Sequence, residues 1–169
     1  MKDLVIIDSG GANTASLVFA LERLGCAAHV SADPAEIRRA ARVILPGVGA
    51  AADAMARLER HGLDEVIPTL TQPLLGICLG MQLLFERSEE GNTRGLGVLP
   101  GTVRRLAAAP DRPVPHMGWN SLEQVADAPL LRGLTSGEYA YFVHGYAAPQ
   151  GPHTLASCSY GVVFSAVVA

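Results

Sequence analysis

The segment GICLGMQ, residues 76–82, places a cysteine between two glycines where an apolar run gives way to a helical pattern. Glycine has no Cβ, so Gly76 and Gly80 allow a backbone turn that is too tight for larger residues. A strand-to-helix turn of this kind has the form of a nucleophile elbow, which would expose the Cys78 side chain at the carboxyl edge of a sheet. The predicted chemistry is nucleophilic catalysis by sulfur.

Backbone amides beside this elbow could stabilise an oxyanion. A helix that starts directly after Cys78 favours a thiolate, and the amide of Leu79 can donate to an oxyanion. The loop PGVG, which follows the preceding predicted strand, could bring a second amide to the same place because Gly47 and Gly49 let its backbone approach closely. Gln82 lies one helical turn past the cysteine and could reach a ligand there.

Each of these features also has a purely structural interpretation. A cysteine at the end of an apolar strand is commonly a small buried hydrophobe, and only the flanking glycines favour a nucleophile at Cys78. Cys26 and Cys158 lack such surroundings and are interpreted as structural. PGVG alone is an ordinary strand-end turn. His116 and His144 are polar residues in apolar settings, and most such histidines are hydrogen-bonded in place.

Composition limits the classes of protein that remain. The 169 residues are 49% hydrophobic and carry a net charge of −3, which predicts one domain over residues 1–169 with a substantial core. The cations are scattered, so we expect no nucleic-acid partner, and no signal peptide or membrane span is visible. The three cysteines form no CxxC pair, which argues against a metal site or a disulfide framework and predicts a cytoplasmic protein.

Apolar runs and helical patterns alternate through the first half of the chain. Residues 4–8, 43–45 and 74–78 are predicted strands without polar alternation, and the helix after the elbow is predicted over residues 79–87. Buried strands followed by helices indicate a parallel sheet that is covered on both faces. After Gly91, prolines and turn-joined β patterns predict an antiparallel extension. The expected fold class is therefore three-layer α/β, with a mostly parallel sheet flanked by helices.

Two helix starts are predicted from local signals. Asn13 can cap the helix that follows the first strand, and Asp33 followed by Pro34 is an N-cap with proline at the first helical position.

Five segments, in this order and spacing, carry a resemblance to a known family: IIDSGGANTASL, LPGVGA, QPLLGICLGMQLLFERSEEG, PHMGWNSL and AYFVHGYAAP. Over nearly its whole length the chain resembles the HisH family, the class I or triad-type glutamine amidotransferase subunits of imidazole glycerol phosphate synthase. The resemblance implies a flavodoxin-like, amidotransferase-type fold and the hydrolysis of glutamine to glutamate and ammonia without a cofactor. It also implies a heterodimer with a barrel-shaped cyclase, HisF, which receives the ammonia in histidine biosynthesis.

The resemblance implies roles for individual residues. Cys78 would form a glutamyl thioester, and the amides of Leu79 and Val48 would make the oxyanion hole. Substrate contacts would come from Gly49, Gln82, His144 and Tyr146, and the partner face would include Asn13, Ser16 and Trp119. Two positions differ from the common pattern, because Ser9 stands where many members have tyrosine and Gly145 where serine is common.

The family takes its general base, and the acid that orients this base, from an HPE motif near the C-terminus. No histidine of this chain is followed by proline. We therefore expect the 169 residues to lack that segment and to have little glutaminase activity by themselves. Three alternatives stay open: a substitute base at His116 or His144, a catalytically inactive module that binds the partner, and an unrelated thiol enzyme that shares the elbow.

Overall fold

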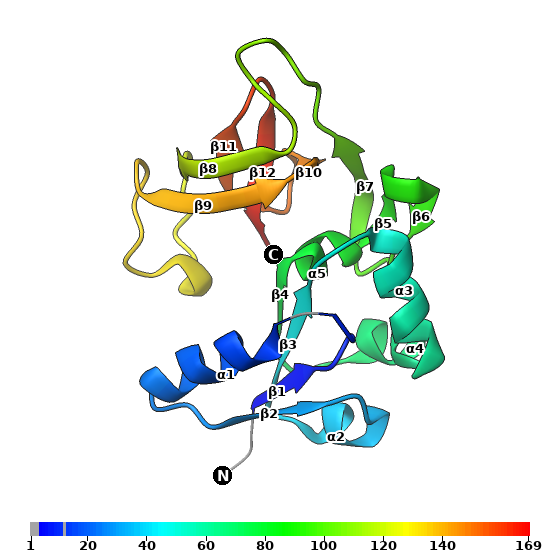
Figure 1. Cartoon of the computed structure of the whole chain (residues 1–169). Coiled ribbons are helices and arrows are strands. Elements are labelled where there is room, and N and C mark those ends of the chain that lie inside the picture. The colour runs from blue at the N-terminus through cyan, green and yellow to red at the C-terminus, as the bar shows by residue number, and fades with distance from the viewer. Residues whose placement is uncertain (1–3, 12) are drawn as a thin grey trace. The chain divides into compact units, whose positions relative to one another are not determined.

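The computed structural model describes residues 4–11 and 13–169, and the chain divides into two compact units, Met1–Pro100 and Gly101–Ala169 (Figure 1). Each unit has a hydrophobic core of its own. The expectation of a single domain over residues 1–169 stays a prediction.

The first unit is built on a parallel sheet of four strands: β1 (Leu4–Ile7), β2 (Ala28–Ser31), β3 (Arg42–Gly47) and β4 (Leu74–Cys78). Their order is β2-β1-β3-β4, so the direction of winding reverses between β1 and β3. In open α/β sheets, ligands bind outside the carboxyl ends of the strands at such a reversal. The predicted elbow at the end of β4 lies at this edge.

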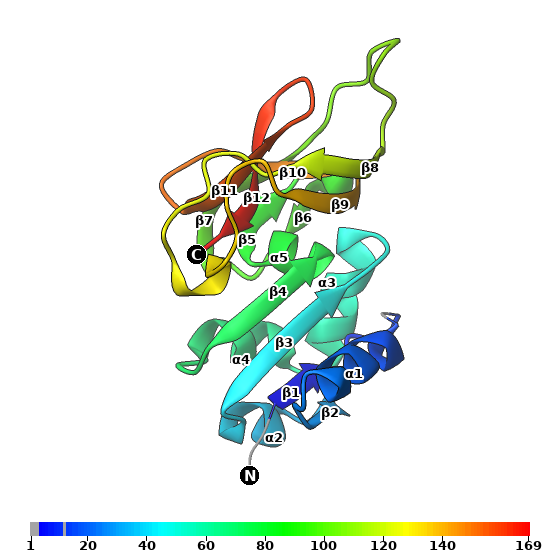
Figure 2. The ribbon, with the colours of Figure 1, turned by 90° about the vertical axis from the view of Figure 1, so that its left-hand side faces the viewer.

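Helices cover both faces of this sheet: α1 (Thr14–Arg23), α2 (Pro34–Arg39), α3 (Ala51–Arg60) and α4 (Leu63–Val66), the last continued by the 3-10 turn η1 (Ile67–Thr69). Figure 2 shows α1 in front of the sheet and α4 behind it. The core on the side of α3 and α4 includes the fully buried Leu58 and Leu63. The predicted caps at Asn13 and Asp33 are present, and the three-layer α/β prediction is confirmed.

The helix after the elbow is shorter than the sequence suggested. The helix α5 spans only Leu79–Leu83. It is followed by β5 (Phe85–Ser88), which pairs antiparallel with β6 (Thr93–Arg94) across the 3-10 turn η2 (Glu90–Asn92). The returning chain closes the helix because the Leu96 amide donates to the Leu83 carbonyl at 2.8 Å. A Cβ at Gly95 would lie 2.1 Å from the carbonyl oxygen of Phe85, so only glycine lets the chain return this closely. The prediction of helix beyond Leu83 is wrong.

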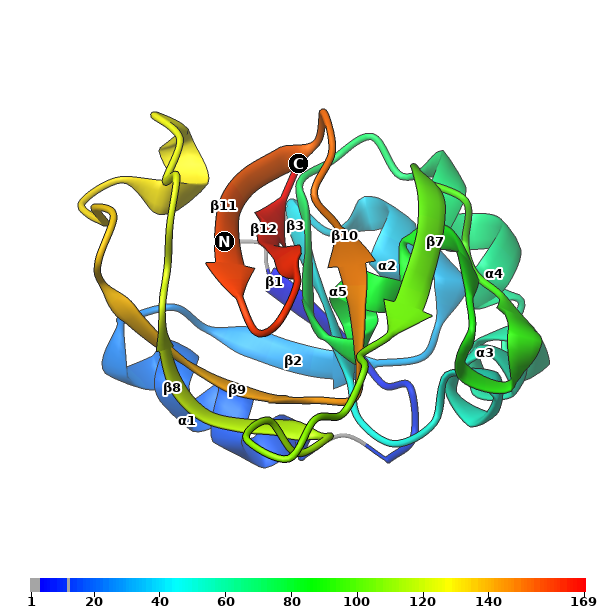
Figure 3. The ribbon, with the colours of Figure 1, turned by 90° about the horizontal axis from the view of Figure 1, so that it is seen from above.

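The second unit is antiparallel, as predicted. Four strands of its sheet lie in the order β11-β12-β10-β7, namely β11 (Thr154–Ser159), β12 (Val163–Val168), β10 (Tyr146–Pro149) and β7 (Leu99–Arg105). The pair β8 (His116–Ser121) and β9 (Tyr139–His144) forms a separate two-stranded sheet (Figure 3). The 3-10 turn η3 (Pro129–Leu131) lies between β8 and β9 in the chain. No helix of the described residues is long and apolar enough to cross a membrane.

Candidate active site

The strand-to-helix turn predicted at Cys78 is present. Cys78 is the last residue of β4 and Leu79 the first residue of α5. The cysteine has φ 55° and ψ −118°, a conformation that residues with a side chain rarely adopt. Backbone strain of this kind costs on the order of 1–3 kcal/mol and is concentrated at functional sites. The side chain of Cys78 is exposed, so the turn presents the thiol to solvent at the sheet edge.

Two glycines let the elbow pack directly on β3. A Cβ at Gly80 would lie 1.9 Å from the carbonyl oxygen of Leu45, and a Cβ at Gly47 would lie 2.3 Å from the Gly80 amide nitrogen. Cβ atoms do not approach other heavy atoms this closely, so the two backbones touch only because neither residue has a side chain. This contact fixes the position of Cys78 relative to the C-terminal end of β3.

The PGVG loop runs beside the cysteine. In the parallel ladder Pro46 pairs with Ile77 and Gly47 with Cys78, so Val48 is the first residue beyond the ladder. Gly49 then turns the chain with φ 86°. The structure therefore brings the loop that carries the Val48 amide next to the residues that carry the thiol and the Leu79 amide.

The far end of this loop is held by an acidic side chain. The amide of Ala51, the first residue of α3, donates to Glu90 Oε2 at 2.8 Å. A carboxylate at a helix N-terminus satisfies an amide that has no partner within the helix. Gln82 lies on α5, one turn after the cysteine, and is half-buried.

In the second unit, two histidines form a directed hydrogen-bond chain. His144 Nδ1 lies 2.8 Å from the carbonyl oxygen of Tyr146, which can only accept, so Nδ1 carries the hydrogen. His144 Nε2 then accepts from His116 Nδ1 at 2.9 Å. His116 Nε2 in turn faces Asn120 Nδ2 at 3.4 Å. This assignment leaves both rings neutral with all four ring nitrogens engaged.

The surroundings of this pair keep it neutral. His116 is 3% exposed, and its ring stacks between Phe142 and Tyr160 at centroid distances of 5.0 and 4.0 Å. Burial lowers the pKa of His116, and the neighbouring His144 lowers it further. Burial also lowers the pKa of His144, partly offset by its bond to the Tyr146 carbonyl. Both histidines are hydrogen-bonded in place, and the geometry gives no support to either as a substitute base.

Comparison with known proteins agrees with this geometry. Residues 5–167 match the family described as glutamine amidotransferase class-I. The chain belongs to this family. It is 56% identical over 168 residues to the HisH subunit of imidazole glycerol phosphate synthase from Xanthomonas campestris pv. campestris (strain 8004), which covers 99% of this chain and 84% of the relative. The HisH subunit from Xylella fastidiosa (strain Temecula1) is 52% identical with the same coverage.

Solved structures with little sequence similarity share the amidotransferase fold. A crystal structure described as glutamine amidotransferase superposes with a TM-score of 0.70 at 20% identity, covering 96% of this chain and 87% of the other. A crystal structure described as a GMP synthase protein from Thermoplasma acidophilum gives a TM-score of 0.67 at 16% identity, covering 98% and 78%. The family, the glutaminase class of activity and the fold predicted from the sequence are thus confirmed.

The amidotransferase chain also presents an aromatic face on the β8–β9 hairpin. Trp119 pairs with Tyr141 across the two strands, and their rings meet edge to face at 5.6 Å. Trp119 is 69% exposed and Tyr141 57% exposed. Three further exposed apolar or aromatic residues lie two positions from them along the strands, on the same face: Met117, Tyr139 and Val143. We call these five residues the hairpin face.

The two other predicted partner residues lie at the start of α1 in the first unit. Asn13 Oδ1 accepts from the Ser16 amide at 3.4 Å, and Ser16 Oγ donates to the Asn13 carbonyl at 2.9 Å. The Asn13 side chain therefore caps the helix, and both side chains remain at the surface. The roles of these residues, and of every other predicted site residue in this amidotransferase, stay predictions.

The sequence analysis did not anticipate the contacts of three polar residues near the elbow, although it noted Ser9 as a departure from the family pattern. Ser9, Arg57 and Glu90 each bond to the backbone of a distant segment. No spacing rule links them to Cys78, because their partners are set by tertiary packing. Among the described residues, 4–11 and 13–169, no group of three or more His, Cys, Asp or Glu side chains could hold a metal ion.

Proposed function

We propose that Cys78 is the nucleophile with which this amidotransferase hydrolyses glutamine to glutamate and ammonia, and that a cyclase subunit receives the ammonia in histidine biosynthesis. The observation that supports this proposal best is the elbow itself. The exposed thiol of Cys78 lies on a strained turn. In the ladder Cys78 pairs with Gly47, the residue directly before the Val48 amide. The relatives named HisH support the reaction and its pathway.

The chemistry follows from the positions of these groups. Cys78 Sγ attacks the carbonyl carbon of the glutamine side chain, and the electron pair of the C=O bond moves to oxygen. The Leu79 and Val48 amides donate to this oxyanion, and removing one such donor typically costs about 10²- to 10³-fold in kcat. Collapse of the tetrahedral intermediate breaks the C–N bond, and the protonated nitrogen leaves as ammonia. Water then adds to the thioester, which releases glutamate and restores the thiol.

Proton transfer requires a base that takes the thiol proton and an acid that protonates the leaving nitrogen. His116 and His144 are the two histidines that the sequence analysis considered for this role. Their ring nitrogens are all engaged within the second unit, in a chain that ends on the Tyr146 carbonyl. We therefore assign the base to neither of them.

The glutamine contacts that we propose are the ones implied by the family resemblance, and each belongs to one of the two units. Gly49, whose positive φ opens the loop, and Gln82 on α5 are the contacts that we propose from the first unit. Tyr146 is the contact that we propose from the second unit. His144 contributes indirectly, because its Nδ1–H holds the Tyr146 carbonyl.

We propose that the hairpin face of the second unit contacts the cyclase, and that the start of α1 in the first unit is a further contact. Contiguous exposed apolar and aromatic side chains mark interaction surfaces, and Trp and Tyr are enriched among the residues that dominate binding energy. Trp119 anchors the hairpin face, and Asn13 and Ser16 add polar contacts. Ammonia released into neutral water would be protonated and lost as a nucleophile, so a heterodimer with a closed path serves the reaction. Cys26, Cys78 and Cys158 are all free, which fits a reducing cytoplasm.

The decisive experiment is the substitution Cys78→Ser in complex with the cyclase, with glutamate release as the measurement. We expect a loss of roughly 10³-fold or more, as for removal of other catalytic nucleophiles. Cys26→Ser, at an exposed cysteine outside the elbow, is the matched control and keeps the wild-type rate. An unchanged rate in Cys78→Ser would exclude a thioester on this residue. The alternatives of an inactive module and an unrelated thiol enzyme are not favoured, because family and relatives agree on an amidotransferase.

A further inference from the structure

We propose that Ser9 and Arg57 are positioning residues for the loop that carries the Val48 amide. In this arrangement Arg57 holds the Ser9 backbone and the Ser9 hydroxyl holds the Pro46 carbonyl, so that the Val48 amide faces the oxyanion. The inference rests on the proposed function, in which that amide is an oxyanion donor. We call the Arg57–Ser9–Pro46 contacts the Ser9 bracket.

The Ser9 bracket begins where the ladder between β1 and β3 ends. The last paired residues are Ile6 and Ile44, yet β3 continues for three more residues to Gly47. Beyond the ladder a side chain replaces the missing main-chain partner, because Ser9 Oγ donates to the Pro46 carbonyl at 3.3 Å. This is the reversal point of the sheet, where open α/β folds bind their ligands.

Ser9 is itself held from two sides. Its amide donates to the Ile7 carbonyl at 3.1 Å, and its own carbonyl accepts from Arg57 Nε at 2.6 Å. The residue is 5% exposed, so water cannot readily replace the Pro46 carbonyl as the partner of its hydroxyl. A buried hydroxyl without a hydrogen bond is unfavourable, so the side chain of Ser9 favours the conformation in which it donates to the Pro46 carbonyl.

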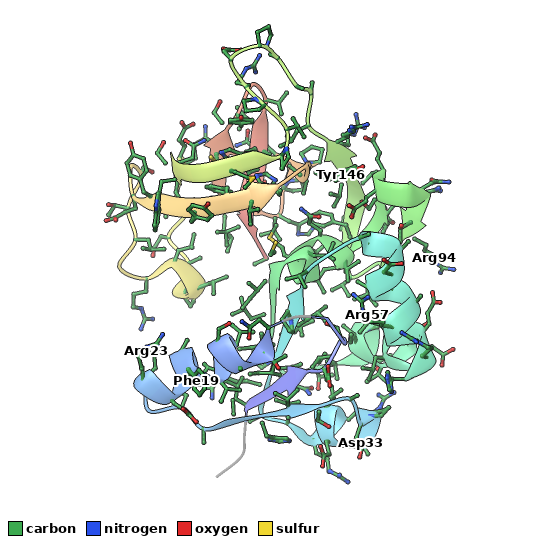
Figure 4. All side chains as sticks on the ribbon, in the orientation of Figure 1. Phe19, Arg23, Asp33, Arg57, Arg94 and Tyr146 are labelled. Atoms are coloured by element: carbon green, nitrogen blue, oxygen red, sulfur yellow. The ribbon has the colours of Figure 1, made fainter. Side chains whose placement is uncertain are left out.

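Arg57 reaches this loop from α3, as the labelled side chain in Figure 4 shows. Its side chain lies along the glycines that follow Ser9, and a Cβ on Gly10 would come within 3.1 Å of Arg57 Cδ. A hydrogen bond from a charged donor is stronger than one between neutral groups. The guanidinium therefore fixes the backbone from which the Ser9 hydroxyl projects.

The bracket limits the orientation of the Val48 amide. A peptide group is planar, so a fixed Pro46 carbonyl fixes the whole plane between residues 46 and 47. Only φ and ψ of Gly47 then separate this plane from the Val48 N–H. Gly47 is packed against the Gly80 backbone, and the other end of the loop is held by the bond from Ala51 to Glu90. Without the Ser9 hydroxyl, the first end of the loop loses its side-chain anchor.

The test compares Ser9→Ala with Ser9→Thr in the complex with the cyclase. We expect kcat of Ser9→Ala to fall about 10-fold, less than the roughly 10²- to 10³-fold for losing a whole donor, with KM within about twofold. Ser9→Thr keeps the hydroxyl and restores most of kcat. Ser157→Ala is the matched control: this buried serine also donates to a backbone carbonyl, that of Glu123 at 3.2 Å, in the second unit. Its kcat stays at the wild-type value.

A second readout does not depend on turnover. In a ¹H–¹⁵N spectrum of the full chain, the Val48 amide signal shifts and broadens or doubles in Ser9→Ala and returns in Ser9→Thr. If Ser9→Ala fails to fold, Arg57→Gln tests the same bracket from its other end and gives the same change in kcat and in the Val48 signal. A wild-type kcat and a wild-type Val48 signal in a folded Ser9 or Arg57 variant would overturn the inference. Activity that survives in Cys78→Ser would instead overturn the proposed function, so the two failures are distinguishable.

Discussion

His116 Nδ1 lies 2.9 Å from His144 Nε2, and two protonated rings cannot keep this contact because both atoms would carry hydrogen. The two histidines are paired across β8 and β9 and their rings point inward, while the next pair of the ladder, Met117 and Val143, is exposed on the hairpin face. Protonation of both rings would therefore break a contact that joins the two strands of the hairpin that we propose for partner binding.

The first prediction is that the chain loses stability in mild acid. Both histidines have a pKa below the ordinary value of 6.5 in the folded protein. Below pH 6.5 the unfolded chain therefore binds more protons than the folded chain, so the free energy of unfolding falls as the pH falls through 6.5. The fall ends once the pH lies below the lowered pKa values. Thermal unfolding between about pH 8 and about pH 5 measures this slope.

The matched variants separate the pair from other titrating groups. His144→Gln removes one partner and should flatten the slope while lowering stability at neutral pH, because the buried His116 loses its acceptor. His61→Gln changes an exposed histidine at the end of α3 and serves as the control substitution. A slope that is equal in wild type and His144→Gln would contradict the assignment.

The second prediction concerns the close contact under the elbow. Gly80→Ala would place a Cβ 1.9 Å from the Leu45 carbonyl oxygen, so the elbow must move away from β3. Overpacking of this kind costs about 3 kcal/mol or more where backbone cannot yield. Glutamate release should fall together with the melting temperature. Gly151→Ala is the control, because nothing lies within 4 Å of a Cβ there, and its melting temperature should be unchanged or slightly raised.

Sequence analysis anticipated the features whose causes are local. Asp33 and Pro34 start a helix wherever the preceding chain allows it, and the glycines around Cys78 indicate a tight turn. The end of α5 is different, because it depends on the return of a distant segment past Gly95. The helical pattern continues through Arg87 in the sequence, yet Arg87 pairs with Arg94 of β6 and is part of a strand.

The candidate site divides in the same way. Cys78, Leu79 and the PGVG loop were found because adjacent residues define them. The positioning contacts of Ser9 and Arg57 were not predicted, since they depend on α3 packing beside the end of β1. An arginine on a helix surface is usually solvated, and only the three-dimensional arrangement shows that this one bonds to a backbone carbonyl.

The third prediction is that a glutamine-like chloroketone alkylates Cys78 alone. Cys158 is buried, and burial raises its pKa to about 11, so it should stay unmodified at neutral pH. Cys26 is exposed but has no elbow beside it to bind the glutamyl group. Peptide mapping by mass spectrometry identifies the labelled cysteine, and excess glutamine should slow the labelling. Labelling of Cys26 at an equal rate, or no protection by glutamine, would count against a glutamine site at the elbow.

The last prediction tests the hairpin face. Trp119 and Tyr141 support each other through their edge-to-face contact, so removing either ring should lower the contribution of the other. We expect Trp119→Ala to weaken cyclase binding by about 30-fold or more, corresponding to roughly 2 kcal/mol or more for a central aromatic anchor. Trp119→Phe keeps a ring and should lose less.

The design includes a matched exposed residue and the double variant. Leu130 on η3 is also apolar and exposed but lies outside the hairpin face, so Leu130→Ala should bind the cyclase as the wild type does. The double variant Trp119→Ala with Tyr141→Ala should lose less than the sum of the single losses, since the two rings act as one unit. Titration calorimetry with the cyclase measures each of these variants and the wild type. Because both rings are largely exposed, the variants should keep the wild-type melting temperature, which separates a binding loss from unfolding. Equal affinity for Trp119→Ala and Leu130→Ala would remove the hairpin face from the interface.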